Sequence, residues 1–302
     1  MTKLAAIILS FLRASWIFAV SCFRFFVPMQ KKSLAQEIVL ITGAGAGIGR
    51  LMSTNFAKQG SVVVLWDINK QWMDETAEII TTQGGKAHSY QCDVTSKDEV
   101  YRLAKQVKKD VGGVTVLVNN AGVVNGKRFL DISDEMIERT MNVNAMGICW
   151  TLKAFLPSMI AQQHGHIVTI ASIMGSCSAP QLSDYCASKH AAVALHESVS
   201  MELIMDNIKG VNMTLVQPYH IDTELFAGVN VGILPPLAPQ FVADRVLLAV
   251  QTNQKVLCLP RLMYWVPFLL SILPLDCVIE IAQGLGFFTA MQSFIGRQKK
   301  KT

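Results

Sequence analysis

The sequence predicts an α/β fold in which a doubly wound, parallel sheet of seven strands carries helices on both faces. From Glu37 onward, short runs rich in β-branched residues alternate with segments of helical periodicity, the pattern of a parallel sheet covered on both sides. A glycine-rich turn lies between the first strand and the first helix, as it does in doubly wound folds. No internal repeat or low-complexity linker interrupts the 302 residues, so we expect one large domain with additions.

We divide the chain into three parts. Residues 1–36 form a membrane-anchoring hydrophobic segment with a basic linker, residues 37–260 form the α/β domain, and residues 261–302 form an apolar, membrane-proximal segment with a basic tail. Helical stretches fit between the strands, and the two longest are predicted over residues 134–162 and 182–206. The seven predicted strands are residues 37–42, 61–66, 87–91, 114–119, 166–171, 211–216 and 255–259.

The N-terminal segment is predicted to be a membrane-associated helix. Leu4 to Val27 is nearly all apolar and long enough to cross a bilayer. Arg13 and Arg24 are eleven residues apart, close to three helical turns, and therefore share one narrow polar face. A spanning helix would place Arg13 near mid-bilayer at a cost of about 2.5–3.5 kcal/mol, so we favour a helix that lies in one leaflet. A cleaved signal peptide is disfavoured because the apolar region is too long.

The net charge of +5 is concentrated at the two ends of the chain. Nine of the 27 basic residues lie there, so that the remaining 18 face 22 acids and the body is acidic overall. The neighbours of the basic residues are apolar, and the body has no basic stripe with interleaved aromatic residues, which favours lipid over nucleic acid as a partner. The nine are Lys3, Arg13, Arg24, Lys31, Lys32, Arg297, Lys299, Lys300 and Lys301.

The cysteines and histidines indicate no metal site. Seven cysteines are scattered, odd in number and never spaced as a pair of ligands, so reduced thiols facing or within the cytosol are the simplest account. His164 and His166 flank Gly165 at the expected entrance of a strand, where a solvated turn is favoured over a ligand pair.

The first strand runs into a turn that is typical of dinucleotide binding. The residues from Thr42 to Gly49 read TGAGAGIG and are followed by a helix. Glycines at 43, 47 and 49 allow a tight turn and let backbone N–H groups and the positive helix end approach a pyrophosphate. The position of the turn between a strand and a helix makes the motif far more specific than the glycines alone.

Asp67 ends the second strand, 24 residues after Gly43. A carboxylate there can accept hydrogen bonds from the ribose hydroxyls of adenosine and would repel a 2′-phosphate, which favours NAD over NADP. Arg50 and Lys70 are nearby cations that could offset this charge or could simply be solvated. A plain turn-forming role at the strand end is the alternative for Asp67.

Tyr185 and Lys189 are four residues apart in YCASK, so that both side chains share one face if the segment is helical. An ammonium beside a phenol would lower the pKa of the phenol from about 10, as a general base for an alcohol proton requires. Ser172 follows a strand end thirteen residues earlier, and Asn144 lies on the preceding predicted helix.

At this point residues 37–260 resemble the short-chain dehydrogenase/reductase family, which has a Rossmann fold. The resemblance is carried by an ordered set of motifs rather than by any one of them. They are the TGxxxGxG turn at Thr42, Gly43, Gly47 and Gly49, then Asp67, the Asp93–Val94 pair, NNAG from Asn119 to Gly122, Asn144, Ser172, and Tyr185 with Lys189.

The resemblance implies a role for each matching residue. Tyr185 would exchange the proton, Lys189 would lower the pKa of Tyr185 and bind ribose, Ser172 would hold the substrate oxygen, and Asn144 would anchor a water relay. Asp93 and Val94 would contact adenine, while Asn119 would support the central strand. The residues implied to bind the cofactor are Thr42, Gly43, Gly47, Ile48, Gly49, Asp67, Asp93, Val94, Asn120, Ala121, Gly122, Tyr185, Lys189, Pro218 and Thr223.

One position departs from the family pattern. After the sixth strand the family usually has Pro-Gly, whereas this chain has Pro218-Tyr219-His220. The backbone contacts to the nicotinamide amide can persist, but the conformation of a glycine is not guaranteed. Thr223 would remain a nicotinamide contact. The segment 222–240 that follows contains glycines and prolines with little periodicity, so both a lid over a substrate site and an inert surface loop fit it.

Within the family, the chain resembles the membrane-associated branch that contains epidermal retinol dehydrogenases and lipid-droplet 17β-hydroxysteroid dehydrogenases. The resemblance implies NAD-dependent oxidation of a lipophilic alcohol, retinol to retinal in preference to a steroid, on the endoplasmic reticulum membrane or lipid droplets with the catalytic domain in the cytosol. Retinal reduction in the reverse direction and a catalytically silent lipid-droplet scaffold are the alternatives. Family members also pair through the two long helices, which implies a homodimer.

The C-terminal part contains a second apolar stretch, residues 256–289. Pro260, Pro267 and Pro274 interrupt it and argue against a straight spanning helix. Two interpretations remain: an apolar flap that touches the bilayer beside the mouth of the active site, or ordinary packing against the body. The last residues, KKKT, resemble a dilysine retrieval signal of the endoplasmic reticulum, although a tail attracted to anionic lipid would have the same sequence.

Overall fold

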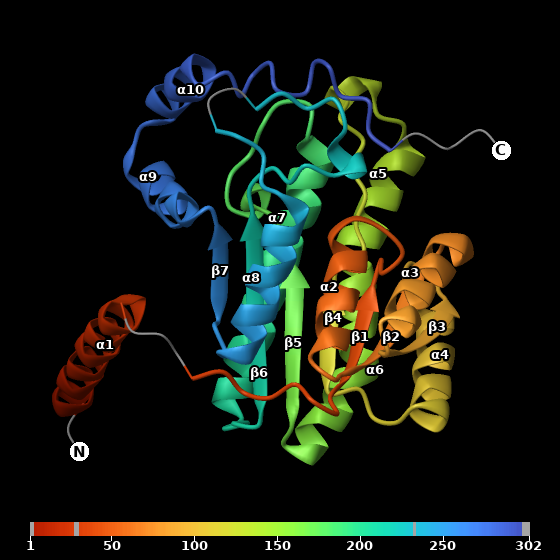
Figure 1. Ribbon diagram of the computed structural model, residues 1–302. Coiled ribbons are helices and arrows are strands. Elements are labelled where there is room, and N and C mark those ends of the chain that lie inside the picture. Colours follow the sequence, from red (N-terminus) through yellow and green to blue (C-terminus); the bar gives the residue numbers. More distant parts are fainter. Residues whose placement is uncertain (1–2, 27–29, 232–233, 298–302) are drawn as a thin grey trace. The chain divides into compact units, whose positions relative to one another are not determined.

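The computed structural model describes residues 3–26, 30–231 and 234–297 and divides the chain into two units, Met1–Lys32 and Ser33–Thr302. In its described residues the first unit contains the helix α1 (Lys3–Phe26), drawn in red in Figure 1. Its large apolar side chains are exposed, Phe11 at 72% and Trp16 at 71%. The predicted end of this segment at Val27 lies outside the described residues, as does the basic tail Lys299–Lys301.

Two helices in the described part of the chain are long and apolar enough to cross a membrane by length and composition. One is the Lys3–Val20 stretch of α1 and the other spans Asp134–Gln162. The second belongs to the core, because Ile148, Leu152 and Phe155 on it are buried against the sheet.

The second unit is built on one parallel sheet of seven strands, as predicted (Figure 1). The strand order is β3-β2-β1-β4-β5-β6-β7, and each neighbouring pair is parallel. The chain leaves β1 toward one edge and returns to pair β4 on its other side, which places the topological switch point between β1 and β4. The strands are β1 (Ile38–Thr42), β2 (Val62–Asp67), β3 (Lys86–Gln91), β4 (Val116–Asn119), β5 (Gly165–Ile170), β6 (Val211–Pro218) and β7 (Val256–Leu259).

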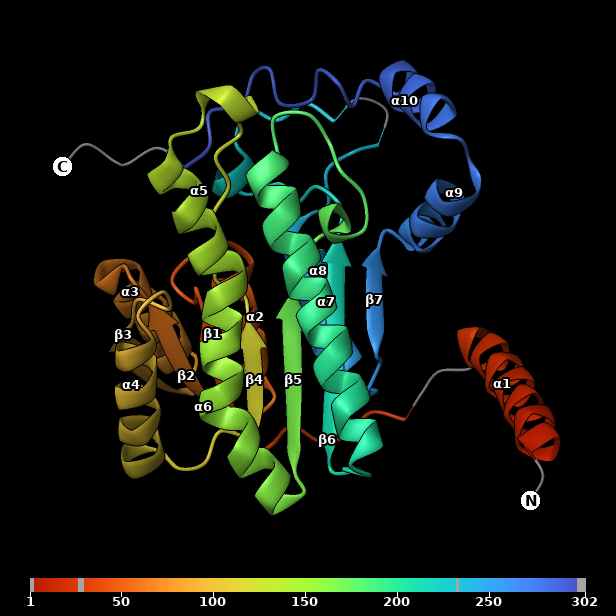
Figure 2. The same cartoon turned by 180° about the vertical axis from the view of Figure 1, so that it is seen from behind.

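Helices cover both faces of this sheet (Figures 1 and 2). Successive residues of a strand point to opposite faces, so Val39 and Ile41 pack in one core cluster and Leu40 in the other. The first cluster is closed by α2 (Gly47–Lys58), α3 (Lys70–Thr82) and α8 (Pro239–Gln251). The second is closed by α4 (Lys97–Asp110), α6 (Gly147–Gln162) and α7 (Ser183–Met205).

The predicted helix 134–162 is one continuous helical run with a widened turn inside it. It consists of α5 (Asp134–Met141), a π-helical turn at Asn142–Met146, and α6. Short 3-10 turns occur where strands or loops meet helices: η1 (Phe129–Asp131), η3 (Ile173–Gly175) and η4 (Glu224–Phe226). Ser172, at the start of η3, accepts a hydrogen bond from the Met174 N–H, which fixes the turn after β5.

The C-terminal apolar stretch is divided into short helices, as its prolines predict. It forms η5 (Arg261–Trp265), α9 (Val266–Ile272) and α10 (Leu275–Gly284). Pro267 lies in the first turn of α9 and Pro274 directly precedes α10, positions where the missing N–H costs nothing. The segment after α10 then crosses above the carboxyl ends of the strands, at the top of Figure 1.

Candidate active site

The glycine-rich turn after β1 requires its glycines. Gly43 and Gly47 have φ angles of +66° and +54°, which side chains disfavour. A Cβ on Gly49 would lie 2.0 Å from the carbonyl oxygen of Gly43, so only glycine lets α2 pack on this turn. Ala46 caps α2 without a side-chain hydrogen bond, which leaves the first N–H groups of the helix for an anion.

Thr42 and Asn120 connect the ends of β1 and β4 on either side of the switch point. The Thr42 hydroxyl oxygen accepts hydrogen bonds from the N–H groups of Asn120 and Ala121, both 3.0 Å long. The Asn120 amide donates to the carbonyl oxygens of Thr42 and Gly43. Asn120 and Ala121 line the cavity, whereas Thr42 does not line it and instead holds their backbone in place.

Asp67 lies at the end of β2 and lines the same cavity. Its carboxylate accepts hydrogen bonds from the N–H groups of Gly45 (2.8 Å) and Asn69 (2.9 Å). Gly45 was not among the predicted site residues, yet a Cβ on it would lie 2.9 Å from an Asp67 oxygen. The TGAGAGIG spacing alone could not reveal this contact, because it depends on where β2 ends.

The two nearby cations are occupied elsewhere. Arg50 donates to the carbonyl oxygen of Gly45 (2.6 Å) and to the Glu75 carboxylate (2.8 Å), and Lys70 pairs with Asp74. Neither side chain lines the cavity, so the negative charge of Asp67 is not offset by them at this end.

Asp93 and Val94 lie outside the cavity lining. Asp93 accepts hydrogen bonds from the N–H and hydroxyl of Thr95, which shapes the turn after β3. Val94 packs against Gly147, and a Cβ added to Gly147 would lie 3.1 Å from the Val94 side chain. Their predicted contact with adenine stays a prediction.

Tyr185 and Lys189 lie on α7 and are almost fully buried, at 5% and 4% exposure. The Lys189 ammonium nitrogen donates to the carbonyl oxygen of Ile170 at the end of β5 (2.9 Å) and lies 5.7 Å from the centre of the Tyr185 ring. Ser172, two residues beyond Ile170, hydrogen-bonds to the Tyr185 phenol. The strand end and the helix thus bring the predicted serine, tyrosine and lysine together.

The expected pKa of Tyr185 needs a correction. The sequence predicted that Lys189 lowers it, but burial has the larger effect and raises the pKa, with only a partial lowering by the Ser172 hydrogen bond. Burial also lowers the pKa of Lys189 to about 8. The reason is that a low-dielectric environment disfavours the charged form of both groups.

Asn144 lies in the π-helical turn and is fully buried. Its amide oxygen accepts a hydrogen bond from the Val123 N–H, and its amide nitrogen donates to the Val123 carbonyl and to the Ser188 hydroxyl, each 2.9 Å long. The side chain thus fixes the loop after β4 to α7. Beside it, a Cβ on Gly122 would lie 3.5 Å from Asn144 and 3.8 Å from Lys189. Asn144 therefore belongs to the Lys189 cluster, and its water relay stays a prediction.

Asn119 connects β4 to the neighbouring helix. Its amide oxygen accepts a 2.7 Å hydrogen bond from the Thr151 hydroxyl on α6. Because both residues are buried, this bond holds the central strand and the helix together beneath the site.

Tyr219, which replaces the family's usual glycine, does not adopt a left-handed φ. Its N–H donates to the Leu259 carbonyl (2.7 Å), and its ring packs edge-on to Phe287 at 6.4 Å between centres. The backbone after β6 therefore accommodates a side chain here. Thr223 lies across the crevice from Gly47, where a Cβ would be 3.8 Å from its methyl group.

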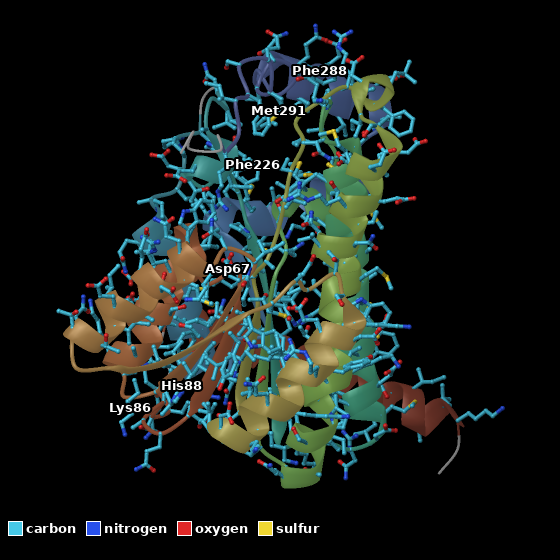
Figure 3. All side chains as sticks on the ribbon, turned by 90° about the vertical axis from the view of Figure 1, so that its right-hand side faces the viewer. Asp67, Lys86, His88, Phe226, Phe288 and Met291 are labelled. Carbon is cyan, nitrogen blue, oxygen red and sulfur yellow. The ribbon has the colours of Figure 1, made fainter. Side chains whose placement is uncertain are left out.

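A cavity of about 430 Å³ joins these parts. Its lower end holds the glycine-rich turn and Asp67, and its middle holds Ser172, Tyr185 and Lys189. The rest is lined mainly by apolar residues of the 173–182 loop, the 219–231 loop, α9, α10 and the segment 285–291. Figure 3 shows Asp67 with Phe226 above it, and Met291 and Phe288 higher still.

Phe226 on η4 lines the cavity at a level between Asp67 and Met291 (Figure 3). Its ring packs edge-on to Tyr185 at 5.9 Å and to His220 at 5.6 Å. Burial lowers the pKa of His220, so an uncharged imidazole faces an apolar chamber. The loop 222–231 lines the cavity rather than forming inert surface.

A phenol and a serine hydroxyl at the carboxyl ends of the strands of a doubly wound sheet, in one cavity with a glycine-rich turn, are the arrangement of a nucleotide-dependent oxidoreductase. The family model of the short chain dehydrogenases matches residues 37–232. The chain is 46% identical to epidermal retinol dehydrogenase 2 of Homo sapiens, over 91% of this chain and 90% of that protein. It is 42% identical to retinol dehydrogenase 10 of Rattus norvegicus, over 95% and 93% respectively. The chain therefore belongs to the short-chain dehydrogenase family and is an alcohol dehydrogenase.

Similar solved structures contain NAD in one case and NADP in another. A short chain dehydrogenase/reductase from Burkholderia phymatum, solved in complex with NAD, is 25% identical with a TM-score of 0.73 and covers 83% of this chain and 96% of its own. A metagenomic short-chain oxidoreductase, solved in complex with NADP, is 30% identical with a TM-score of 0.63 and covers 75% and 96%. These similarities leave the choice between NAD and NADP to the residues of this chain.

Proposed function

We propose that the protein oxidises a retinol-type alcohol to its aldehyde with NAD, with Tyr185 as the proton acceptor. The observation that carries this proposal is the single cavity in which Ser172 and Tyr185 stand between the glycine-rich turn and a long apolar chamber. A lipophilic alcohol with its hydroxyl at Ser172 would keep its apolar body among side chains of the loop 219–231, α9 and α10. The similar retinol dehydrogenases support the same substrate class.

The residues present fit a dinucleotide. The cradle at Gly43, Gly47 and Gly49 has no space for side chains or needs left-handed backbone, and the α2 N-terminus supplies N–H groups for phosphate. A dinucleotide held there would supply the hydride acceptor for the alcohol carbon. Ser172 orients the alcohol oxygen, and Tyr185 takes the hydroxyl proton, which leaves a carbonyl. The Lys189 ammonium stabilises the phenolate that Tyr185 needs for this step.

We propose NAD rather than NADP because Asp67 lines the adenosine end of the cavity and Arg50 is already paired. A 2′-phosphate placed near this carboxylate would meet like charge.

The reverse reaction, reduction of a retinal-type aldehyde, is the second candidate. Burial raises the pKa of Tyr185, which keeps the phenol protonated and ready to donate to a carbonyl oxygen. The direction therefore depends on the nucleotide supplied as well as on the protein.

A substrate panel on membranes that contain the full chain tests these assignments. We expect NADH to form with all-trans-retinol, and to form at least about tenfold more slowly with estradiol or when NADP replaces NAD. Membranes from cells without the chain are the control. A preference for estradiol would indicate a steroid substrate instead of a retinoid. Faster reduction of retinal than oxidation of retinol would indicate the reverse reaction. The absence of turnover with every substrate would indicate a nucleotide-binding scaffold without catalytic activity.

We further propose that the chain is attached to a membrane, with its catalytic unit in the cytosol on the endoplasmic reticulum or on lipid droplets. Helix α1 exposes large apolar side chains between Leu4 and Phe18. On the catalytic unit, α9 and α10 line the cavity with one set of residues and expose another set, which gives a lipophilic alcohol a path from lipid into the site. The exposed set is Phe268, Ile272 and Leu275, together with Trp265 at the end of η5, and each is more than half exposed.

Fractionation tests the attachment. We expect the full chain to stay in the membrane pellet after an alkaline carbonate wash, because apolar contact does not depend on charge. Protease added to sealed microsomes is expected to digest the catalytic unit. A chain released into the supernatant, or protected from protease, would contradict the proposal.

A further inference from the structure

The segment that follows α10, residues 285–297, is called the C-terminal strap here. Two hydrogen bonds, from the N–H groups of Ile295 and Gly296 to the Ala227 carbonyl, join it to the loop 222–231 at 2.9 and 3.1 Å. The Ser293 hydroxyl donates to the Gly228 carbonyl at 2.7 Å. The strap is therefore docked on the loop that carries Phe226 over the active site.

Two glycines allow this docking. Gly228 has a φ of +83°, and a Cβ on it would lie 2.1 Å from the Ser293 carbonyl oxygen. Gly126, in the loop after β4, has a φ of +64°, and a Cβ there would lie 2.1 Å from the Phe294 ring. The strap thus contacts both the loop that follows β6 and the loop that follows β4.

Arg297, at the described end of the strap, lies over the nucleotide end of the cavity and lines it. Its guanidinium carbon is 4.9 Å from the centre of the Trp72 ring, and its Nε is 4.0 Å from the Glu224 carboxylate. A Cβ added to Gly45 would lie 2.9 Å from the Trp72 side chain. A Cβ added to Gly47 would lie 3.8 Å from the methyl group of Thr223, the residue before Glu224. Contacts on both sides therefore place Arg297 above residues 45–47, where α2 begins.

The position of Arg297 matters because the cavity lining contains few cationic side chains that could bind phosphate. Among the described residues that line it, the cationic side chains are Lys189 and Arg297. Lys189 is committed to the Ile170 carbonyl beside Tyr185. The carboxylate next to Arg297, that of Glu224, is 76% exposed and farther than hydrogen-bond distance. A pyrophosphate bound at the α2 N-terminus would be a better partner, because a guanidinium can bind phosphate oxygens in a bidentate manner.

We infer that Arg297 binds the pyrophosphate of the dinucleotide and that the C-terminal strap is part of the cofactor site. This inference rests on the proposed dinucleotide site at the glycine-rich turn. The Trp72 ring holds the guanidinium from one side, and the strap closes the crevice over the turn. Because the strap continues from α10, the helices that line the substrate chamber and the residue that holds the cofactor belong to one C-terminal segment.

Equilibrium binding of NADH and NADPH to the full chain in detergent micelles tests the inference, with nucleotide fluorescence as the signal. We expect Arg297→Ala to weaken the binding of NADH and of NADPH by the same factor, about tenfold, since both nucleotides contain the pyrophosphate. Arg297→Lys is expected to restore part of the loss, and Glu224→Gln to tighten binding about twofold by removing a competing charge. Arg102→Ala, an exposed arginine on α4 outside the cavity, is the matched control.

Each outcome has a distinct meaning. Loss of NADPH binding alone would overturn the inference, because Arg297 would then contact the 2′-phosphate. Unchanged affinities for both nucleotides would overturn it as well, provided that wild-type chain binds. If wild-type chain bound neither nucleotide, the proposed cofactor site itself would be wrong. Without nucleotide, the thermal unfolding midpoint of Arg297→Ala is expected to fall by only a few degrees, because the side chain loses just its contact with Trp72 and a 4.0 Å pairing with the exposed Glu224.

Discussion

Replacement of Tyr185 by phenylalanine is expected to lower kcat for retinol oxidation by about 10³-fold or more, because general acid–base catalysis contributes about 10²–10⁴-fold. The phenol is the group that hydrogen-bonds to Ser172 at the centre of the cavity, and phenylalanine removes its oxygen while keeping the ring. The edge-on contact with Phe226 should persist, so the fold and the chamber remain. Retinol oxidation by membranes that contain equal amounts of each variant measures the effect.

Binding separates a chemical role of Tyr185 from a structural one. Tyr185→Phe is expected to bind NADH within about threefold of wild type, because the ring and the glycine-rich turn are unchanged. Tyr90→Phe is the matched control, since this tyrosine lies on β3 and its hydroxyl contacts Asp110. If Tyr185→Phe turned over retinol at the wild-type rate, Tyr185 would not be the proton acceptor.

The strand pattern and the motif spacing predicted the framework of this site correctly. Runs rich in β-branched residues predicted most strands to within two residues, because parallel strands that are buried on both faces are nearly continuously apolar. The exception is the edge strand β3, which has no β-branched residue and no buried one. Tyr185 and Lys189 were predicted to share a face, since the helical period alone determines it. Both features depend on residues that are close in the chain.

The features that sequence reasoning missed depend on distant residues. Gly45 contacts Asp67 only because β2 ends beside the turn, and Arg297 reaches Trp72 only because the strap returns across the sheet. The pKa of Tyr185 was predicted in the wrong direction for the same reason, since burial is set by every element packed around α7. A cue was present in the sequence for the strap: the basic tail begins at Arg297, shortly after the apolar stretch 256–289.

Replacement of Lys189 by methionine is expected to lower kcat by about 10²-fold or more and, at the same time, to make the folded protein more stable near pH 7. The loss of activity follows from removing the cation beside the phenol. The gain in stability follows from burial, which lowers the pKa of Lys189 from 10.5 to about 8 in the folded protein. Chemical unfolding of the full chain in micelles, followed at several pH values, measures the second effect.

The sign of the stability change is set by proton binding. The unfolded lysine holds its proton up to about pH 10.5 and the folded one only up to about 8, so the charged form opposes folding at every pH below 8. This cost is on the order of 3 kcal/mol, and losing the hydrogen bond to Ile170 offsets about 1 kcal/mol of the gain from methionine. The difference in free energy of unfolding between Lys189→Met and wild type should therefore be largest below pH 8 and shrink as the pH rises toward 10.5. Lys105→Met, at an exposed site on α4, should show no such pH dependence, and a pH-independent difference for Lys189→Met would contradict the burial cost.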